Sequence, residues 1–183
     1  MDYLNITHYF DNKSMLVQLS YKIYSKLRGN YHYYLPYPEF SATKITSNIY
    51  IGDINSAYQK EHLNKEGITH IVSCVLGNTP GYPSDFKYLV VDVIDNEQEN
   101  LTDKFEEAVH FIERAILENG KVLIHCVCGI SRSVSITIAY LIYKEDMTIE
   151  EALKLIQSKR PIANPNPSFL KQLQLFYKNH GSK

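Results

Sequence analysis

The chain has 183 residues, of which 44% are hydrophobic and 21% are charged, and its formal net charge is -1. This length suits one compact domain with a sizeable core and a short extension. The near-neutral charge argues against nucleic acid or an acidic membrane as the main partner. The start of the chain has no basic region followed by an apolar run, and no stretch is apolar enough to span a bilayer. We therefore predict neither a secretory signal nor a membrane segment.

The first forty residues are expected to form a helix followed by an extended aromatic strap. Four large apolar residues of the segment 14–28 fall on one helical face: Leu16, Leu19, Ile23 and Leu27. The segment 29–40 contains several tyrosines and two prolines, which favour an extended chain lying on the domain. The sequence thus predicts an N-terminal helix and strap at 1–40 and the main domain at 41–183.

The main domain alternates segments typical of strands with segments typical of helices. Strands are predicted at Ile45, 48–51, 70–75, 88–93 and 121–125. Helices are predicted at 56–66, 103–118, 133–145, 148–159 and 168–179. Thr102 is the expected cap of the second helix, and Thr148 with Glu151 forms an expected capping box for the fourth. This alternation predicts an α/β fold with a central, largely parallel sheet flanked by helices.

The segment KVLIHCVCGISRSVSITIAYLI, residues 121–142, carries the strongest chemical signal. An apolar strand ends at His125, a loop follows from Cys126 to Arg132, and an apolar helix begins there. A thiolate at a helix N-terminus is stabilised by the helix dipole and by backbone N–H groups. The same N–H groups, pointing inward from a tight loop, form a cradle for a tetrahedral phosphate.

Three further residues of this segment suit a phosphate-handling loop. Gly129 lets the loop turn without a side chain blocking the pocket. Arg132, six residues after Cys126, could hold two phosphoryl oxygens with its planar guanidinium. Ser133 could hydrogen-bond the sulfur of Cys126 and help that sulfur to leave phosphorus in the second step of a reaction. A buried structural cysteine beside a surface arginine is the alternative, but the position between an apolar strand and an apolar helix favours a reactive site.

The segment HCVCGISRS resembles the signature of the protein tyrosine phosphatase superfamily, His-Cys, five residues, Arg-Ser. The chain as a whole resembles the dual-specificity branch of that superfamily over about residues 43 to 178. The similar segments are ITSNIYIGDINSA, GITHIVSCV, AYLI and KRPIANPNPSFLKQL. The resemblance implies a protein tyrosine phosphatase-like fold of the dual-specificity type, a phosphocysteine intermediate, and neither a metal nor an organic cofactor. Pro167-Ser168 departs from the family, where a small glycine-containing pair is common.

The resemblance also implies which residues form the site. Cys126 is the nucleophile, and the residues expected to bind the phosphoryl group are Val127, Cys128, Gly129, Ile130, Ser131 and Arg132. His125 is a supporting residue, and Asn166 is expected to brace the phosphate loop from behind. Arg160 matches a position that helps some relatives to bind a second phosphate. A cation at the C-terminal end of a helix is the alternative interpretation of Arg160.

The family's general acid is an aspartate on a loop before the cysteine, and VVDVIDNEQENLT offers Asp92 and Asp95. Asp92 lies within a predicted strand, so it should be structural or solvent-facing. Asp95 opens the loop, and we predict that it acts as the general acid and then as the base. Glu97 and Glu99 are assigned to a solvated loop.

The three cysteines, Cys74, Cys126 and Cys128, show no disulfide-framework spacing. They indicate a reducing compartment, so we expect a cytoplasmic location with diffusion into the nucleus. A protective disulfide between Cys126 and either of the other two thiols is one hypothesis, and simple packing of those two is the other.

The expected substrate is a phosphoprotein. The chain has no tryptophan, so it lacks the Trp-Pro-Asp loop of strictly tyrosine-specific phosphatases. A shallower pocket that admits phosphoserine, phosphothreonine and phosphotyrosine is therefore predicted. A phosphoinositide or RNA 5' end is an alternative substrate, but the loop has no Lys or His between Cys126 and Arg132. A catalytically inactive phosphate-binding module is a second alternative, against which stands the presence of all four catalytic residue types. Nothing in the sequence indicates an oligomeric state.

Overall fold

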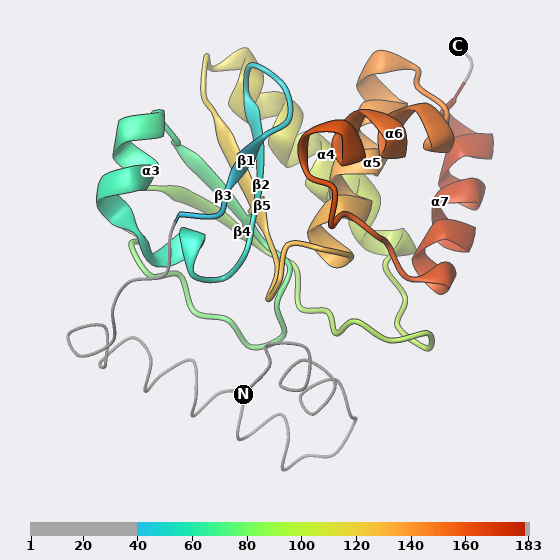
Figure 1. Ribbon diagram of the computed structural model, residues 1–183, viewed down its shortest axis with the longest axis horizontal. Coiled ribbons are helices and arrows are strands. Elements are labelled where there is room, and N and C mark those ends of the chain that lie inside the picture. The colour runs from blue at the N-terminus through green and yellow to red at the C-terminus, as the bar shows by residue number, and fades with distance from the viewer. Residues whose placement is uncertain (1–39, 182–183) are drawn as a thin grey trace.

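A computed structural model describes residues 40–181 and shows a three-layer α/β fold (Figure 1). The sheet lies in the middle, with α3 (Lys60–Glu66) on one side. The other side carries four helices: α4 (Thr102–Leu117), α5 (Arg132–Glu145), α6 (Ile149–Lys159) and α7 (Pro167–His180). The helix expected at 14–28 lies outside the described residues, as does nearly all of the aromatic strap.

The sheet has five strands in the order β1-β2-β5-β3-β4, and every neighbouring pair except β1 and β2 is parallel. The strands are β1 (Thr43–Lys44), β2 (Ile49–Gly52), β3 (His70–Ser73), β4 (Lys87–Val90) and β5 (Val122–His125). This confirms the largely parallel sheet. The register pairs His125 at the end of β5 with Gly52 and Ser73 on its two neighbours. The residue after β5 therefore lies at the centre of the carboxyl edge of the sheet.

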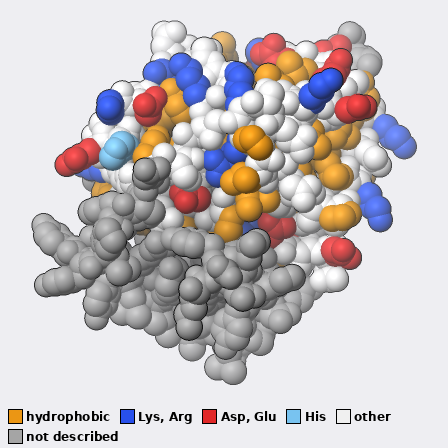
Figure 2. Space-filling model, viewed as in Figure 1, with side chains coloured by type: hydrophobic (Ala, Val, Ile, Leu, Met, Phe, Trp, Pro, Cys, Tyr) orange, Lys and Arg blue, Asp and Glu red, His pale blue; other side chains and the backbone are white. Residues whose placement is uncertain are grey.

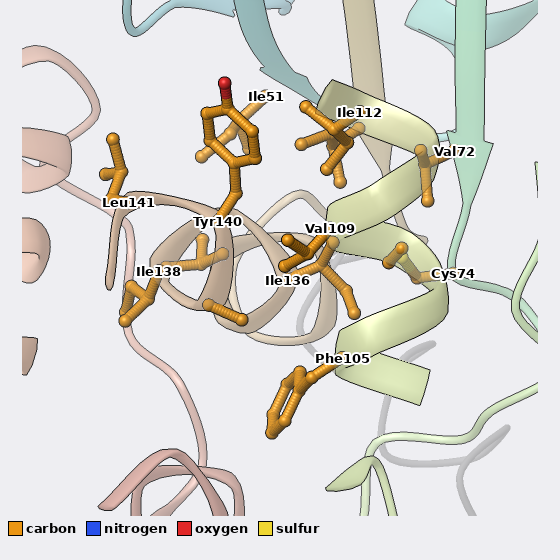
Figure 3. Packing of buried hydrophobic residues seen from close by; sticks show 14 of the residues in the cluster. Ile51, Val72, Cys74, Phe105, Val109, Ile112, Ile136, Ile138, Tyr140 and Leu141 are labelled. Carbon is orange, nitrogen blue, oxygen red and sulfur yellow. The ribbon is translucent and has the colours of Figure 1, made fainter. Parts of the chain in front are cut away.

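Two hydrophobic clusters, one on each face of the sheet, follow from the alternation of side chains along the strands. On β5, Val122 and Ile124 join the larger cluster, and Leu123 joins the smaller one beside α3. Figure 3 shows Ile51 and Val72 within the larger cluster, among side chains of α4 and α5. The sheet is thus anchored on both faces, which holds its carboxyl edge rigid.

Helix α5 is the central helix of the thicker layer. Every residue from 132 to 142 is buried, and the helix packs against α4, α6, α7 and the sheet. Burial on all sides explains its nearly continuous apolar sequence. Its first residue, Arg132, closes the loop that follows β5, so the packing of α5 determines where that loop lies. No helix within residues 40–181 is long and apolar enough to cross a membrane.

Several element boundaries differ from the sequence-based prediction. Strand β4 ends at Val90 rather than at residue 93, so Asp92 lies beyond the strand and is exposed. The helix predicted at 56–66 is a short 3-10 turn, η1 (Ser56–Tyr58), followed by α3. The first strand lies at Thr43–Lys44 rather than at Ile45, because Ile45 already turns back to bond with Ile49.

The helix caps also differ in part. The capping box of Thr148 and Glu151 is confirmed at the start of α6. Thr102 is not a cap but the first residue of α4, and its N–H donates to Oδ1 of Asn100. Helix α7 begins at Pro167, one residue before the prediction, and the side chain of Asn166 caps it.

Candidate active site

The loop between β5 and α5, residues 126–131, lies where parallel α/β sheets bind their ligands, at the carboxyl ends of the strands. Cys126 is its first residue, and Arg132 begins α5 directly after it. Both side chains are buried. The strand, the loop and the helix thus occur in the order that the sequence predicted.

Each of the five backbone carbonyls of residues 127–131 accepts a hydrogen bond from a donor that lies outside residues 127–131. Val127 O accepts from Ile54 N at 3.2 Å, and Ile130 O accepts from Asn164 N at 2.8 Å. Ser131 O accepts from both the N–H and the hydroxyl of Ser135. Arg160 donates to the other two carbonyls, Gly129 O at 2.7 Å and Cys128 O at 3.2 Å.

The outward carbonyls determine the direction of the N–H groups in the same loop. In a trans peptide the C=O of one residue and the N–H of the next point to opposite sides. With the carbonyls of 127–131 turned outward, the N–H groups of 128–132 turn toward the interior of the loop. Such a ring of N–H groups binds anions. The loop is therefore arranged to hold a phosphoryl group before any ligand arrives.

At Gly129 a side chain would be strained by the backbone conformation and by its neighbours. The φ of Gly129 is +67°, in the left-handed region that favours glycine. A Cβ atom at this position would lie 2.6 Å from Nη2 of Arg160 and 2.6 Å from the carbonyl oxygen of Gly52. Glycine therefore permits both the turn and the close approach of Arg160.

The sulfur of Cys126 accepts two hydrogen bonds inside the loop, from Gly129 N at 3.2 Å and from Ser133 Oγ at 3.4 Å. Burial on its own would raise the pKa of this thiol. The positive charge of Arg132 and the hydrogen bonds from Ser133 outweigh burial, and the pKa of Cys126 is held below its ordinary value. The surroundings of Cys126 thus favour the thiolate, the form that a nucleophilic cysteine requires.

His125, the supporting residue, is fully buried directly before the nucleophile. Burial lowers its pKa to about 4, so the imidazole is neutral at neutral pH. The positive charge beside the Cys126 sulfur therefore comes from Arg132 and not from this histidine.

Asp95 contacts the phosphate loop, residues 126–131, and the residue that follows it. Its Oδ1 accepts from Ser131 Oγ at 2.9 Å and from Asn166 Nδ2 at 2.7 Å. Its Oδ2 lies 3.5 Å from Nε of Arg132. The structure therefore brings Asp95, Ser131, Arg132 and Asn166 together. Asp92, the other local aspartate, is exposed and accepts from Gly77 N at 2.7 Å, away from this group.

The predicted second-phosphate role of Arg160 is not supported by its position. The side chain is buried, and its guanidinium donates to oxygens on two sides. Besides the two loop carbonyls, Nη1 donates to Ser41 O at 2.7 Å and to Thr43 Oγ1 at 3.0 Å. Arg160 thus joins the loop to the segment before β1 and holds the loop carbonyls outward. Its place at the end of α6 also matches the alternative interpretation of a cation near a helix C-terminus.

The two other thiols differ in their relation to Cys126. Cys74 is fully buried, follows β3 directly, and donates its N–H to His125 O at 2.8 Å. Neighbouring strands lie about 4.8 Å apart, within the range of Cα separations that disulfides span. Burial raises the pKa of Cys74, which keeps it protonated. Cys128 is partly exposed in the loop itself. The protective disulfide stays a prediction for both thiols.

Sequence reasoning missed the residues that hold the loop from outside. Ile54 and Asn164 act through backbone N–H groups, which carry no residue-specific signal, and Ser135 acts through both its N–H and its hydroxyl. It also missed the contact of Asn166 with Asp95. A signal for the cap was present, since Asn followed by Pro is typical of the first two positions of a helix.

Replacing Arg132 with Met should raise the pKa of Cys126, because the charge that favours the thiolate is lost. The pH midpoint of alkylation at Cys126 should therefore rise above that of the wild-type protein. The measurement is iodoacetamide incorporation at Cys126 against pH, quantified on the peptide by mass spectrometry. Lys144→Met removes an exposed cation at the other end of α5 and should leave the midpoint unchanged. A midpoint that does not move in Arg132→Met would contradict this account.

Comparison with known proteins agrees with this geometry. The family model for the dual specificity phosphatase catalytic domain matches residues 49–179. The chain is 41% identical over 137 residues to Dual specificity protein phosphatase 1B of Arabidopsis thaliana, which covers 75% of this chain and 82% of that protein. It is 44% identical over 130 residues to Dual specificity protein phosphatase 1 of the same plant, covering 71% of this chain and 66% of that protein.

A solved structure shows the same fold. The human tyrosine phosphatase-like serine/threonine/tyrosine-interacting protein superposes with a TM-score of 0.72 and 32% sequence identity, covering 77% of this chain and 98% of that chain. The family match spans the phosphate loop, Asp95 and the start of α7. The chain belongs to the dual specificity phosphatase family.

Proposed function

We propose that the protein hydrolyses phosphotyrosine, phosphoserine and phosphothreonine in protein substrates through a phosphocysteine intermediate. The observation that carries this proposal is the placement of the Cys126 sulfur. It lies inside a loop in which the carbonyls of residues 127–131 point outward, Arg132 lowers the pKa of the Cys126 thiol, and Asp95 lies beside Arg132. This arrangement supports Cys126 as the nucleophile, the loop as the anion cradle and Asp95 as the proton donor, the three groups that phosphoryl transfer requires.

In the first step, the Cys126 thiolate attacks phosphorus, and the bond from phosphorus to the side-chain oxygen of the substrate breaks. Asp95 in its protonated form donates its proton to that departing oxygen. The guanidinium of Arg132 and the inward N–H groups bind the three non-bridging oxygens of the phosphoryl group. These fixed dipoles and charge should supply most of the stabilisation of the transition state.

In the second step, water attacks the phosphorus of the phosphocysteine and the S–P bond breaks. Asp95, now a carboxylate, accepts the proton of the water. Ser133 Oγ, which lies 3.4 Å from Sγ, donates to the sulfur and favours its departure as a thiolate. Inorganic phosphate then leaves, and the enzyme returns to its starting state.

The surroundings of the loop favour a phosphoprotein over a highly charged substrate. Between Cys126 and Arg132 the loop has no basic side chain, and Arg160 is buried beneath it. Acidic and basic side chains are interspersed on the described part of the face in Figure 2, with no field of one sign. A phosphoinositide or an RNA 5' end would require more cations at the site.

The free cysteines support a cytoplasmic location with access to the nucleus.

The function is tested with two peptides that differ only in carrying phosphotyrosine or phosphothreonine. The wild-type protein should release phosphate from both in the presence of a metal chelator, and vanadate should inhibit it. Cys126→Ser should lose at least about a thousandfold in kcat/KM, because the nucleophile is absent. Asp95→Asn should also lose activity, whereas Asp92→Asn, at the exposed neighbouring carboxylate, should retain it.

The possible outcomes separate the competing functions. Phosphate release from the phosphotyrosine peptide alone would restrict the substrates to phosphotyrosine and would not contradict the phosphocysteine mechanism. Phosphopeptide binding without turnover by the wild-type protein would contradict the proposal and favour a phosphate-binding module.

The role of Arg160 is tested with singly and doubly phosphorylated peptides. If Arg160 holds the loop carbonyls, Arg160→Lys should lower kcat/KM for both peptides equally, by about tenfold or more, because two charge-assisted hydrogen bonds to the loop are lost. Lys154→Met, at an exposed cation of the same helix α6, should change neither value. A loss confined to the doubly phosphorylated peptide would instead restore the second-phosphate role.

A further inference from the structure

We propose that Asn166 and Ser131 are positioning residues that direct Asp95 to donate its proton from Oδ2, and that this keeps the enzyme active on alkyl phosphates. The inference rests on the proposed function and deepens it. It starts from the three polar contacts of the Asp95 carboxylate: Ser131 Oγ and Asn166 Nδ2 on Oδ1, and Arg132 Nε near Oδ2.

The direction of the Ser131 contact follows from a backbone group. The N–H of Asn166 donates to Ser131 Oγ at 3.0 Å. A backbone N–H has no acceptor capacity, so the serine oxygen must accept there. Its own hydroxyl proton remains available, and it points to Asp95 Oδ1 at 2.9 Å. Ser131 is therefore a donor to the aspartate.

The direction of the Asn166 contact follows in the same way. The N–H of Phe169 donates to Asn166 Oδ1 at 2.9 Å, which is the cap of α7. That bond identifies the amide oxygen, so the other terminal atom of the side chain is the NH2 group. This NH2 group faces Asp95 Oδ1 at 2.7 Å. Asn166 is therefore also a donor, and its orientation is set by the helix that it caps.

Two donors on Oδ1 disfavour the proton of the aspartic acid on that atom. A hydroxyl at Oδ1 would oppose the NH2 group of Asn166, which cannot reverse while its amide oxygen caps α7, and it would require the Ser131 hydroxyl to turn its proton away. The proton is therefore favoured on Oδ2, where the neighbouring donor, Nε of Arg132, lies at the longer distance of 3.5 Å. The pair thus selects which oxygen donates and fixes the carboxyl plane relative to the bound phosphoryl group.

This arrangement matters most for poor leaving groups. An alkoxide from serine or threonine is far more basic than the phenoxide of tyrosine, so it depends more on receiving a proton as the bond to phosphorus breaks. Loss of a hydrogen-bond donor to Asp95 should therefore reduce activity toward phosphothreonine more than toward phosphotyrosine. Asn166 and Ser131 would then influence the balance between the two substrate classes without touching the substrate side chain.

The test compares wild type, Asn166→Ser and Ser131→Ala on phenyl phosphate, 4-nitrophenyl phosphate and the matched phosphothreonine and phosphotyrosine peptides. Asn166→Ser keeps an oxygen that caps α7 and removes only the NH2 donor. The quantity is kcat/KM, because it covers the first chemical step, in which the acid acts. Ser168→Ala, beside the same helix start but bonded to Gln172, is the control that should behave as wild type. Thermal melting confirms that each variant is folded.

Both variants should lose about tenfold or more on the phosphothreonine peptide, less than about threefold on 4-nitrophenyl phosphate, and an intermediate factor on phenyl phosphate and the phosphotyrosine peptide, whose phenoxide leaving groups are alike. In an Asp95→Asn background, Asn166→Ser should cause no further loss, because the acid through which it acts is gone. An equal loss on all substrates, no loss on any, or full additivity with Asp95→Asn would overturn the inference while leaving the phosphatase mechanism intact. A wild-type protein inactive on every substrate would overturn the proposed function and the inference with it.

Discussion

The outward orientation of five consecutive carbonyls in the loop 127–131 is the constraint on which the site depends. A loop this tight turns its N–H groups inward only if its carbonyl oxygens find donors elsewhere, because a buried carbonyl without a partner is costly. Three donors come from distant parts of the chain: Ile54 after β2, Arg160 at the end of α6 and Asn164 before α7. The fourth, Ser135, lies in the first turn of α5. The anion cradle is therefore a product of the whole fold and not of the signature segment alone.

The same construction explains how a buried thiol can ionise. Burial of Cys126 opposes ionisation, and the structure counters it with Arg132 and the Ser133 hydrogen bonds. Cys74, on the adjacent strand end, is equally buried but lacks hydrogen bonds of this kind, and its pKa is raised. Two cysteines at neighbouring positions of one sheet edge thus differ in reactivity because of what surrounds each sulfur. The start of α5 supplies that difference.

The sequence predicted what is local and missed what depends on tertiary packing. The strand, loop and helix around Cys126 are continuous in sequence, and the apolar pattern on both sides makes their order predictable. The alternation of strands and helices likewise predicted the α/β sheet. Asp95 was chosen from its position at the start of a loop, and the structure places it beside Arg132.

Arg160 and Asn166 show why the remainder could not be predicted. An arginine at the end of a helix looks the same in sequence whether it faces solvent or lies buried under a loop. The packing at the end of α6 decides whether the arginine is exposed or buried, and here it buries Arg160 against the phosphate loop. The hydrogen bond from Asn166 to Asp95 joins residues 71 positions apart, and no sequence spacing records it, whereas the cap of Asn166 on Phe169 N is local.

The most direct test of the central claim is to identify the covalent intermediate. The protein would be mixed with excess 4-nitrophenyl phosphate, quenched in acid during turnover, and digested at low pH for mass spectrometry. The account predicts one phosphate on the peptide that contains Cys126, on the sulfur, and its absence from the Cys126→Ser variant. Phosphate on a different residue, or steady hydrolysis with no phosphorylated Cys126 peptide at any quench time, would contradict the assignment of Cys126 as the nucleophile.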